Sequence, residues 1–68
     1  MRVLINGESC ELEAGTTLAE VVASLPGIPD GRGIAVALDG EVVPRGAWSR
    51  TELTDGTKVE VVVAVQGG

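Results

Sequence analysis

The sequence predicts an α+β domain in which one small mixed sheet packs on one helix. Three observations predict this fold class. Two dipeptides, Asn6-Gly7 and Asp39-Gly40, each separate short apolar segments, a pattern typical of β-hairpins. Helical periodicity occurs in one short stretch between the two hairpins. The last apolar segment, residues 59–65, has hydrophobic side chains on both faces, as is usual for the central strand of a sheet.

Composition restricts the class of protein and the kinds of partner. The 68 residues suffice for one small domain, 1–68, whose core must be aliphatic because the chain has no Phe, no Tyr and one Trp. A net charge of −5 argues against binding nucleic acid or an anionic membrane, and favours a partner with a basic face. With no His and one Cys, disulfide frameworks, Cys/His zinc sites and His-dependent triads are excluded. We expect no metal site and, without a signal peptide or membrane-spanning segment, a cytoplasmic protein.

The first hairpin is predicted to begin with a strand over residues 1–5. A two-residue turn at Asn6-Gly7 pairs Ile5 with Glu8 and Val3 with Cys10. Paired side chains share a face, and those expected to face the core are Met1, Val3, Ile5, Cys10 and Leu12. Cys10 is therefore interpreted as a small buried residue and not as a redox or catalytic thiol, because no base or second cysteine accompanies it.

A short helix is predicted next, with Thr17 as its N-cap. Thr17 and Glu20 have the spacing of a capping box. Apolar residues at helical spacing form one face: Leu18, Val21, Val22 and Leu25. Pro26 and Gly27 end the helix. A helix this short is marginal alone, so it is expected to be held by packing on the sheet.

The second hairpin is predicted from residues 34–43. Gly31-Arg32-Gly33 shares features with a phosphate-binding loop, but a strand and not a helix follows it, so a glycine-rich turn is the better interpretation. A strand over residues 34–38 turns into a short strand that Pro44 ends, as expected at a sheet edge. Trp48, in the turn or single helical turn that follows, is expected to close the open end of the core.

The final strand runs directly into Gln66, Gly67 and Gly68. Its parity places Val59, Val61, Val63 and Val65 on one face, and Lys58, Glu60, Val62 and Ala64 on the other. Because the intervening elements supply a crossover, parallel pairing with the first strand is expected. Glycines without Cβ make the tail, 66–68, thin and flexible. The hypothesis is that the Gly68 carboxylate is the functional group; the alternative is an inert glycine-rich chain end.

Several segments together resemble a known family. They are residues 36–45 (VALDGEVVPR), Trp48, Asp55-Gly56 and the ending AVQGG, with Asn6-Gly7-Glu8 in the first hairpin. These motifs, spread over nearly the whole chain, resemble the thiamine-biosynthesis sulfur carrier (ThiS) family, whose fold is the ubiquitin-like β-grasp. Asp39 departs from the Asn that is usual in this family, and Val62-Val63 from a usual Thr or Arg before the Ala-Val-Gln.

The resemblance implies a role for the tail. An E1-like adenylating enzyme, using Mg·ATP, would activate the carboxylate of Gly68, with Gln66 and Gly67 required for activation. A cysteine desulfurase or rhodanese-like donor would convert it to a thiocarboxylate, and thiazole synthase would receive the sulfur. The chain would then be a carrier and co-substrate and not an enzyme, with no catalytic residue and no bound cofactor of its own.

A docking patch is predicted on the sheet face that points away from the helix. Leu4, Val62 and Ala64 are expected there, with Ala35, Ala37 and Val42 beside them, and Glu60 would help to orient a basic partner. The alternative is that these are scattered surface residues. Other functions also stay open: sulfur transfer to molybdopterin, cysteine or tRNA, a protein modifier that ends as an isopeptide on lysine, and an interaction module with an inert tail.

Overall fold

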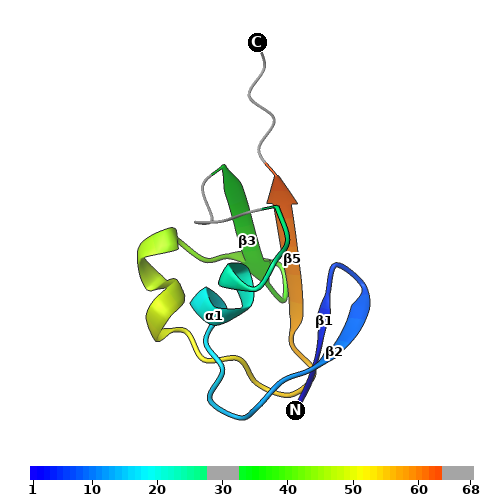
Figure 1. The fold of residues 1–68 in the computed structure, drawn as a ribbon. Coiled ribbons are helices and arrows are strands. Elements are labelled where there is room, and N and C mark those ends of the chain that lie inside the picture. The colour runs from blue at the N-terminus through cyan, green and yellow to red at the C-terminus, as the bar shows by residue number, and fades with distance from the viewer. Residues whose placement is uncertain (28–32, 64–68) are drawn as a thin grey trace.

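The computed structural model describes residues 1–27 and 33–63, and it confirms the predicted α+β class (Figure 1). Within these residues five strands form one sheet: β1 (Arg2–Ile5), β2 (Glu8–Glu11), β3 (Ile34–Leu38), β4 (Glu41–Val42) and β5 (Lys58–Val63). One α-helix, α1 (Leu18–Ala23), and one 3₁₀ helix, η1 (Arg45–Arg50), complete the described elements.

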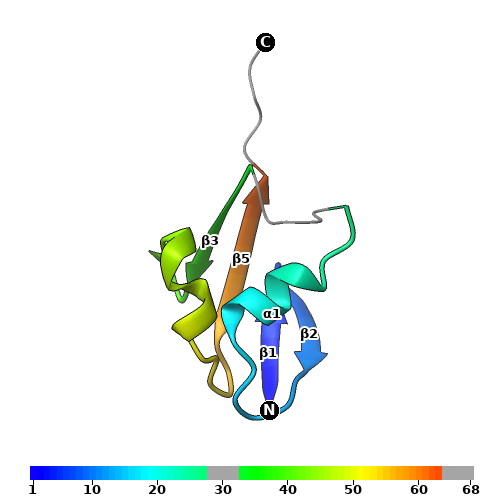
Figure 2. The same cartoon turned by 60° about the vertical axis from the view of Figure 1, so that its left-hand side comes forward.

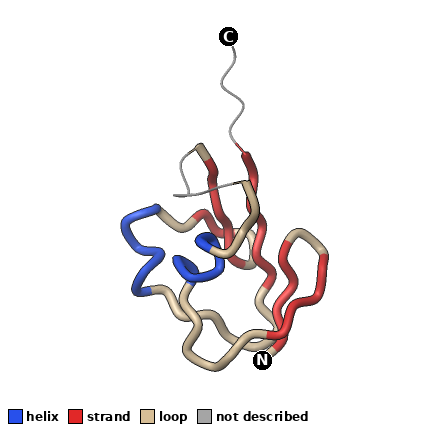
Figure 3. The backbone as a smooth tube through the Cα atoms, viewed as in Figure 1, coloured by secondary structure: helices blue, strands red, loops and turns tan. Residues whose placement is uncertain are grey.

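The strand order in the sheet is β2-β1-β5-β3-β4, so β5, the last of the described strands, is central, as predicted. Strand β5 is parallel to β1, with Ile5 opposite Val59, and antiparallel to β3, with Val36 opposite Val61. Figures 2 and 3 show α1 and η1 on the same side of the sheet. The sheet is thus packed on one face, and the described residues place no helix over the other.

Both hairpin turns form where the sequence predicts them. Asn6 and Asp39 have φ angles of 50° and 47°, and the glycine after each also has a positive φ. This is the backbone that two-residue turns of type I′ require, and Asn and Asp tolerate it better than other side-chain-bearing residues. The pairing of Val3 with Cys10 confirms the predicted register of the first hairpin.

The buried core joins α1, η1 and the inner face of the sheet. Its members are Val3, Leu18, Val21, Val22, Val36, Trp48, Leu53 and Val59. Trp48 is 6% exposed and its indole N–H donates to the carbonyl of Val43 at 2.9 Å, which confirms its place in the core. Cys10 is partly buried against this core, opposite Val3. Leu53 was not among the core residues expected from the sequence.

One expectation about the helix is wrong, and one strand residue with inward parity is exposed. Helix α1 ends at Ala23, so Leu25 follows the helix and is only partly buried; the residue before a proline is disfavoured in the α conformation, and Pro26 follows Leu25. Val63 has the inward parity but is 61% exposed. A six-residue helix covers about 9 Å and a six-residue strand about 20 Å, so the end of β5 extends past the helix that would bury it.

The capping box is confirmed. The Thr17 hydroxyl accepts a hydrogen bond from the Glu20 N–H, and the Glu20 carboxylate accepts one from the Thr17 N–H, both at 3.3 Å. Replacing Thr17 by alanine is expected to lower the free energy of unfolding by about 1 kcal/mol, because the Glu20 N–H loses the hydroxyl oxygen that caps it. Urea titration followed by Trp48 fluorescence measures this. Glu20→Gln keeps both bonds and is expected to cost only about 0.3 kcal/mol; an equal loss in both variants would contradict the capping role.

Candidate functional site

The sheet surface opposite α1, here called the open face, carries the residues expected to dock a partner. Its members are Leu4, Ala35, Ala37, Val42, Lys58, Glu60 and Val62. Strand pairing places them together: Ala35 lies opposite Val62 and Ala37 lies opposite Glu60. The side-chain parity predicted from the sequence is therefore confirmed for the described part of β5.

The apolar part of the open face is concentrated on β5, β3 and β4. Val62 is 62% exposed and Val42 is 73% exposed, with Ala35 and Ala37 between them on β3. Exposed valines on one face of a small domain, joined by small apolar residues, are typical of a surface that a partner covers. The structure thus brings together four of the residues expected on this surface.

Leu4 lies on the same face but away from Val62. It is partly buried and pairs with Lys58, four residues before Val62 on β5. Four residues of strand span about 13 Å, so a partner must cover a long patch to contact both side chains. Leu4 and Val62 are therefore two ends of the open face and not one cluster.

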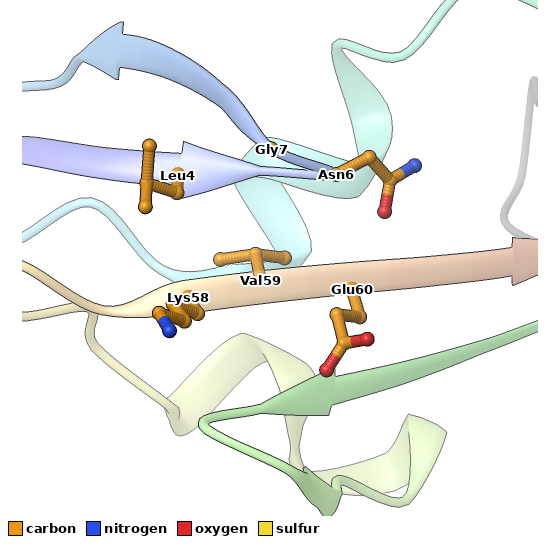
Figure 4. Close-up of a pocket in the computed structure, with 6 residues that line it drawn as sticks. All are labelled: Leu4, Asn6, Gly7, Lys58, Val59 and Glu60. Atoms are coloured by element: carbon orange, nitrogen blue, oxygen red, sulfur yellow. The ribbon is translucent and has the colours of Figure 1, made fainter.

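A shallow hollow of about 350 Å³ lies beside Leu4, between β1 and β5 (Figure 4). It forms because β1 ends at Ile5 and the hairpin turns away, whereas β5 continues. The residues that line it are Leu4, Asn6, Gly7, Lys58, Val59 and Glu60. Lys58 and Glu60 are exposed and bring one positive and one negative charge to this part of the open face.

Two polar side chains of the turns also contact β5, and sequence reasoning assigned them no such role. The Asn6 side chain hydrogen-bonds both backbone polar groups of Val61, and the Asp39 carboxylate accepts a bond from the Lys58 N–H at 3.0 Å. The signal available in the sequence was the identity of the first turn residue, because Asn and Asp side chains readily bond backbone groups.

The predicted tail residues Ala64, Gln66, Gly67 and Gly68 lie outside the described residues. Strand β5 ends at Val63, directly before them. In residues 1–27 and 33–63, no three His, Cys, Asp or Glu side chains are grouped so that they would hold a metal ion. The same residues include no helix of the length and hydropathy that crossing a membrane requires.

Comparisons with known proteins agree on one family. The model of the ThiS family matches residues 3–68. The chain is 30% identical to the sulfur carrier protein ThiS of Escherichia coli over the whole of both chains. It superposes on the crystal structure of the thiamine biosynthesis protein ThiS from Geobacter metallireducens with a TM-score of 0.83, at 27% identity and with both chains fully covered.

Two further relatives are much longer. The chain is 34% identical to a thiazole synthase of Paramagnetospirillum magneticum and 35% identical to one of Magnetococcus marinus. Each match covers the whole of this chain and 20% of the relative, so the chain spans about a fifth of the length of these proteins.

Proposed function

The chain belongs to the ThiS family, and we propose that it is a sulfur carrier that supplies the sulfur of the thiazole ring in thiamine biosynthesis. The observation that carries this proposal is the family match over residues 3–68, which extends through Gly67 and Gly68. The carrier-sized relative from Escherichia coli, aligned over its full length, supports the same role.

The proposed chemistry takes place at the carboxylate of Gly68. A carboxylate is a poor electrophile because its leaving group would be oxide. An oxygen of the Gly68 carboxylate attacks the α-phosphorus of Mg·ATP, pyrophosphate leaves, and the acyl-adenylate now has AMP as its leaving group. The terminal sulfur of a partner's persulfide attacks the acyl carbon and displaces AMP. A thiol then reduces the acyl disulfide, forms a new disulfide with the partner's sulfur and leaves the thiocarboxylate.

The catalytic groups for these steps would belong to partner enzymes. An E1-like adenylating enzyme would hold ATP and Mg²⁺, and a cysteine desulfurase or rhodanese-like protein would provide the persulfide. Thiazole synthase is proposed as the acceptor, which two relatives of that name support because they contain a segment similar to this whole chain. The chain would be a co-substrate of these enzymes in the cytoplasm, where thiols are kept reduced.

The open face is the surface proposed to dock the adenylating enzyme. Val62 lies one residue before the described end of β5, so a partner that covers the open face would also be placed to receive the residues that follow. Ala64 continues the parity of Val62 and Leu4 and is included in this proposal. The net charge of −5, with Glu60 on the open face, would steer a partner whose docking surface is basic.

Intact mass spectrometry tests the proposal. The natural protein is incubated with Mg·ATP, an adenylating enzyme, a desulfurase and cysteine, and its mass is expected to rise by the difference between one sulfur and one oxygen. The starting mass also establishes whether Gly68 is the last residue. A variant without Gly68 is expected to keep its mass. An unchanged mass of the natural protein, with the same enzymes active on the Escherichia coli carrier, would overturn the proposal.

The acceptor is tested with the product of that reaction. Adding thiazole synthase and its other substrates to the thiocarboxylate form is expected to return the carrier to its starting mass as the thiazole forms. Loss of sulfur only to a molybdopterin, cysteine or tRNA pathway enzyme would reassign the acceptor and keep the carrier chemistry. Covalent conjugates on lysines of larger proteins would instead indicate a protein modifier.

A further inference from the structure

The pairing of β1 with β5 stops at a defined hydrogen bond. The Leu4 N–H donates to the carbonyl of Thr57 at 3.0 Å, and the Asn6 N–H donates to the carbonyl of Val59 at 2.9 Å. In a continued parallel ladder, the carbonyl of residue 6 would accept from the Val61 N–H, and the N–H of residue 8 would donate to the Val61 carbonyl. The chain turns away at Asn6, whose φ is 50°, so the backbone makes neither bond.

The side chain of Asn6 makes both bonds in place of the backbone. Its Oδ1 accepts from the Val61 N–H at 2.8 Å, and its Nδ2 donates to the Val61 carbonyl at 3.3 Å. Figure 4 shows this side chain at the end of β1, beside β5. A carboxamide carries the same donor and acceptor as a peptide group, so Asn6 extends the ladder by one step that the backbone cannot take.

The second turn shows a matched arrangement with different chemistry. The Asp39 N–H donates to the Lys58 carbonyl at 2.8 Å, so only the Lys58 N–H needs a partner, and the carboxylate of Asp39 accepts it at 3.0 Å. An acceptor suffices at Asp39, whereas both a donor and an acceptor are needed at Asn6. The residue type at each turn therefore follows from the backbone groups that it meets on β5.

We propose that Asn6 is a positioning residue for the adenylation of Gly68, an inference that rests on the proposed function. Asn6 holds β5 at Val61, one residue before the exposed Val62 of the open face and two residues before the described end of the strand. Beyond Ile5, no strand in the described part of the chain flanks β5 on the β1 side. The Asn6 carboxamide therefore replaces that missing strand close to the described end of β5.

This position links the docking surface to the reacting group. A partner that binds the open face must receive the tail in one direction. Without the Asn6 bonds, β5 would be more mobile at Val61, and this mobility would have to be lost on binding. The free energy needed to order β5 would weaken association with the partner and leave the chemical step at Gly68 unchanged. Loss of the Asn6 carboxamide is therefore expected to change the KM for the carrier and not kcat.

The test uses two variants at each turn. Asn6→Gly keeps a residue that accepts positive φ and removes both bonds to Val61; Asn6→Asp keeps the acceptor and sets an oxygen against the Val61 carbonyl. Both are expected to raise the KM for the carrier about tenfold at unchanged kcat. In Asn6→Gly, hydrogen exchange of the Val61 amide is expected to become about tenfold faster. Asp39→Gly and Asp39→Asn are the matched controls, expected to stay within about twofold of the wild-type KM.

Each outcome separates this inference from the proposed function. A wild-type carrier that is adenylated, together with an Asn6→Gly variant of wild-type KM and faster Val61 exchange, would show that Asn6 acts only in folding and would overturn the positioning role. An equal rise of KM in Asp39→Gly would overturn it as well, because the effect would then reflect general loosening of β5. A wild-type protein that is not adenylated overturns the proposed function itself, and the positioning role with it.

Discussion

Replacing Leu18 by alanine is expected to remove about 2–5 kcal/mol from the free energy of unfolding. Leu18 is 0% exposed and begins α1, where it lies in the core with Val3, Val36 and Val59 of the sheet. Its backbone N–H donates to the Thr51 carbonyl at 2.8 Å, and that bond persists in the variant, so the loss reports side-chain packing. Domains of 68 residues have roughly 3–10 kcal/mol of stability, so the variant is expected to be partly unfolded.

Leu25→Ala is the matched control for this experiment. It deletes the same atoms from a residue that follows α1 and is only partly buried. Its cost is expected to be about 1 kcal/mol or less, because little apolar surface returns to water. Both variants are compared by urea unfolding at constant m value. A loss below about 1 kcal/mol for Leu18→Ala would contradict the assignment of this side chain to the centre of the core.

Replacing Val62 by aspartate is expected to lower kcat/KM for adenylation about thirtyfold, which corresponds to the roughly 2 kcal/mol of a central interface residue. Val62 is 62% exposed on the open face, so the change is expected to leave the free energy of unfolding within about 0.5 kcal/mol. The carboxylate would have to be desolvated beneath a docked partner, and this cost is expected to exceed any gain from attraction to basic groups of that partner. Val62 gives a cleaner test than Leu4, which is partly buried.

Val63→Asp controls for the face of the sheet. Val63 is the next residue, has nearly the same exposure at 61%, and points to the other side of β5. It is expected to retain kcat/KM within about threefold, the effect of a charge at an interface rim. An equal loss in both variants would show that the partner recognises the end of β5 from both sides, and would contradict docking through the open face.

Much of the fold could be predicted because its signals are local. Two-residue turns such as Asn6-Gly7 set the register of the strands that they join, and a one-residue shift would reverse every side chain. The capping box, a motif of four residues from Thr17 to Glu20, marked the start of the helix at Leu18. The central place of β5 was predicted from apolar side chains on both of its faces, and the structure confirms that place although it covers only the face toward α1.

The remaining features depend on how distant elements are placed, which local patterns do not specify. Leu53 is buried in the same core as residues of α1 and η1, in a segment without regular periodicity where a bridge joins Thr17 to Glu52. The bonds of Asn6 to Val61 require residues 55 positions apart to meet. At the candidate site, parity predicted the open face, but the separation of Leu4 from Val62 depends on the stagger between β1 and β5.

The central position of β5 also decides when this protein folds during its synthesis. Strands β1 and β3 are not neighbours in the sheet and are joined only through β5, which the ribosome makes last among the strands. A nascent chain that lacks residues 58–63 consists of separate hairpins and a helix with no sheet on which to pack, and non-local pairing of this kind forms late. The open face does not exist until β5 is in place. An enzyme that recognises that face would therefore not bind a chain that has been completed but has not folded, so only folded carriers would be activated.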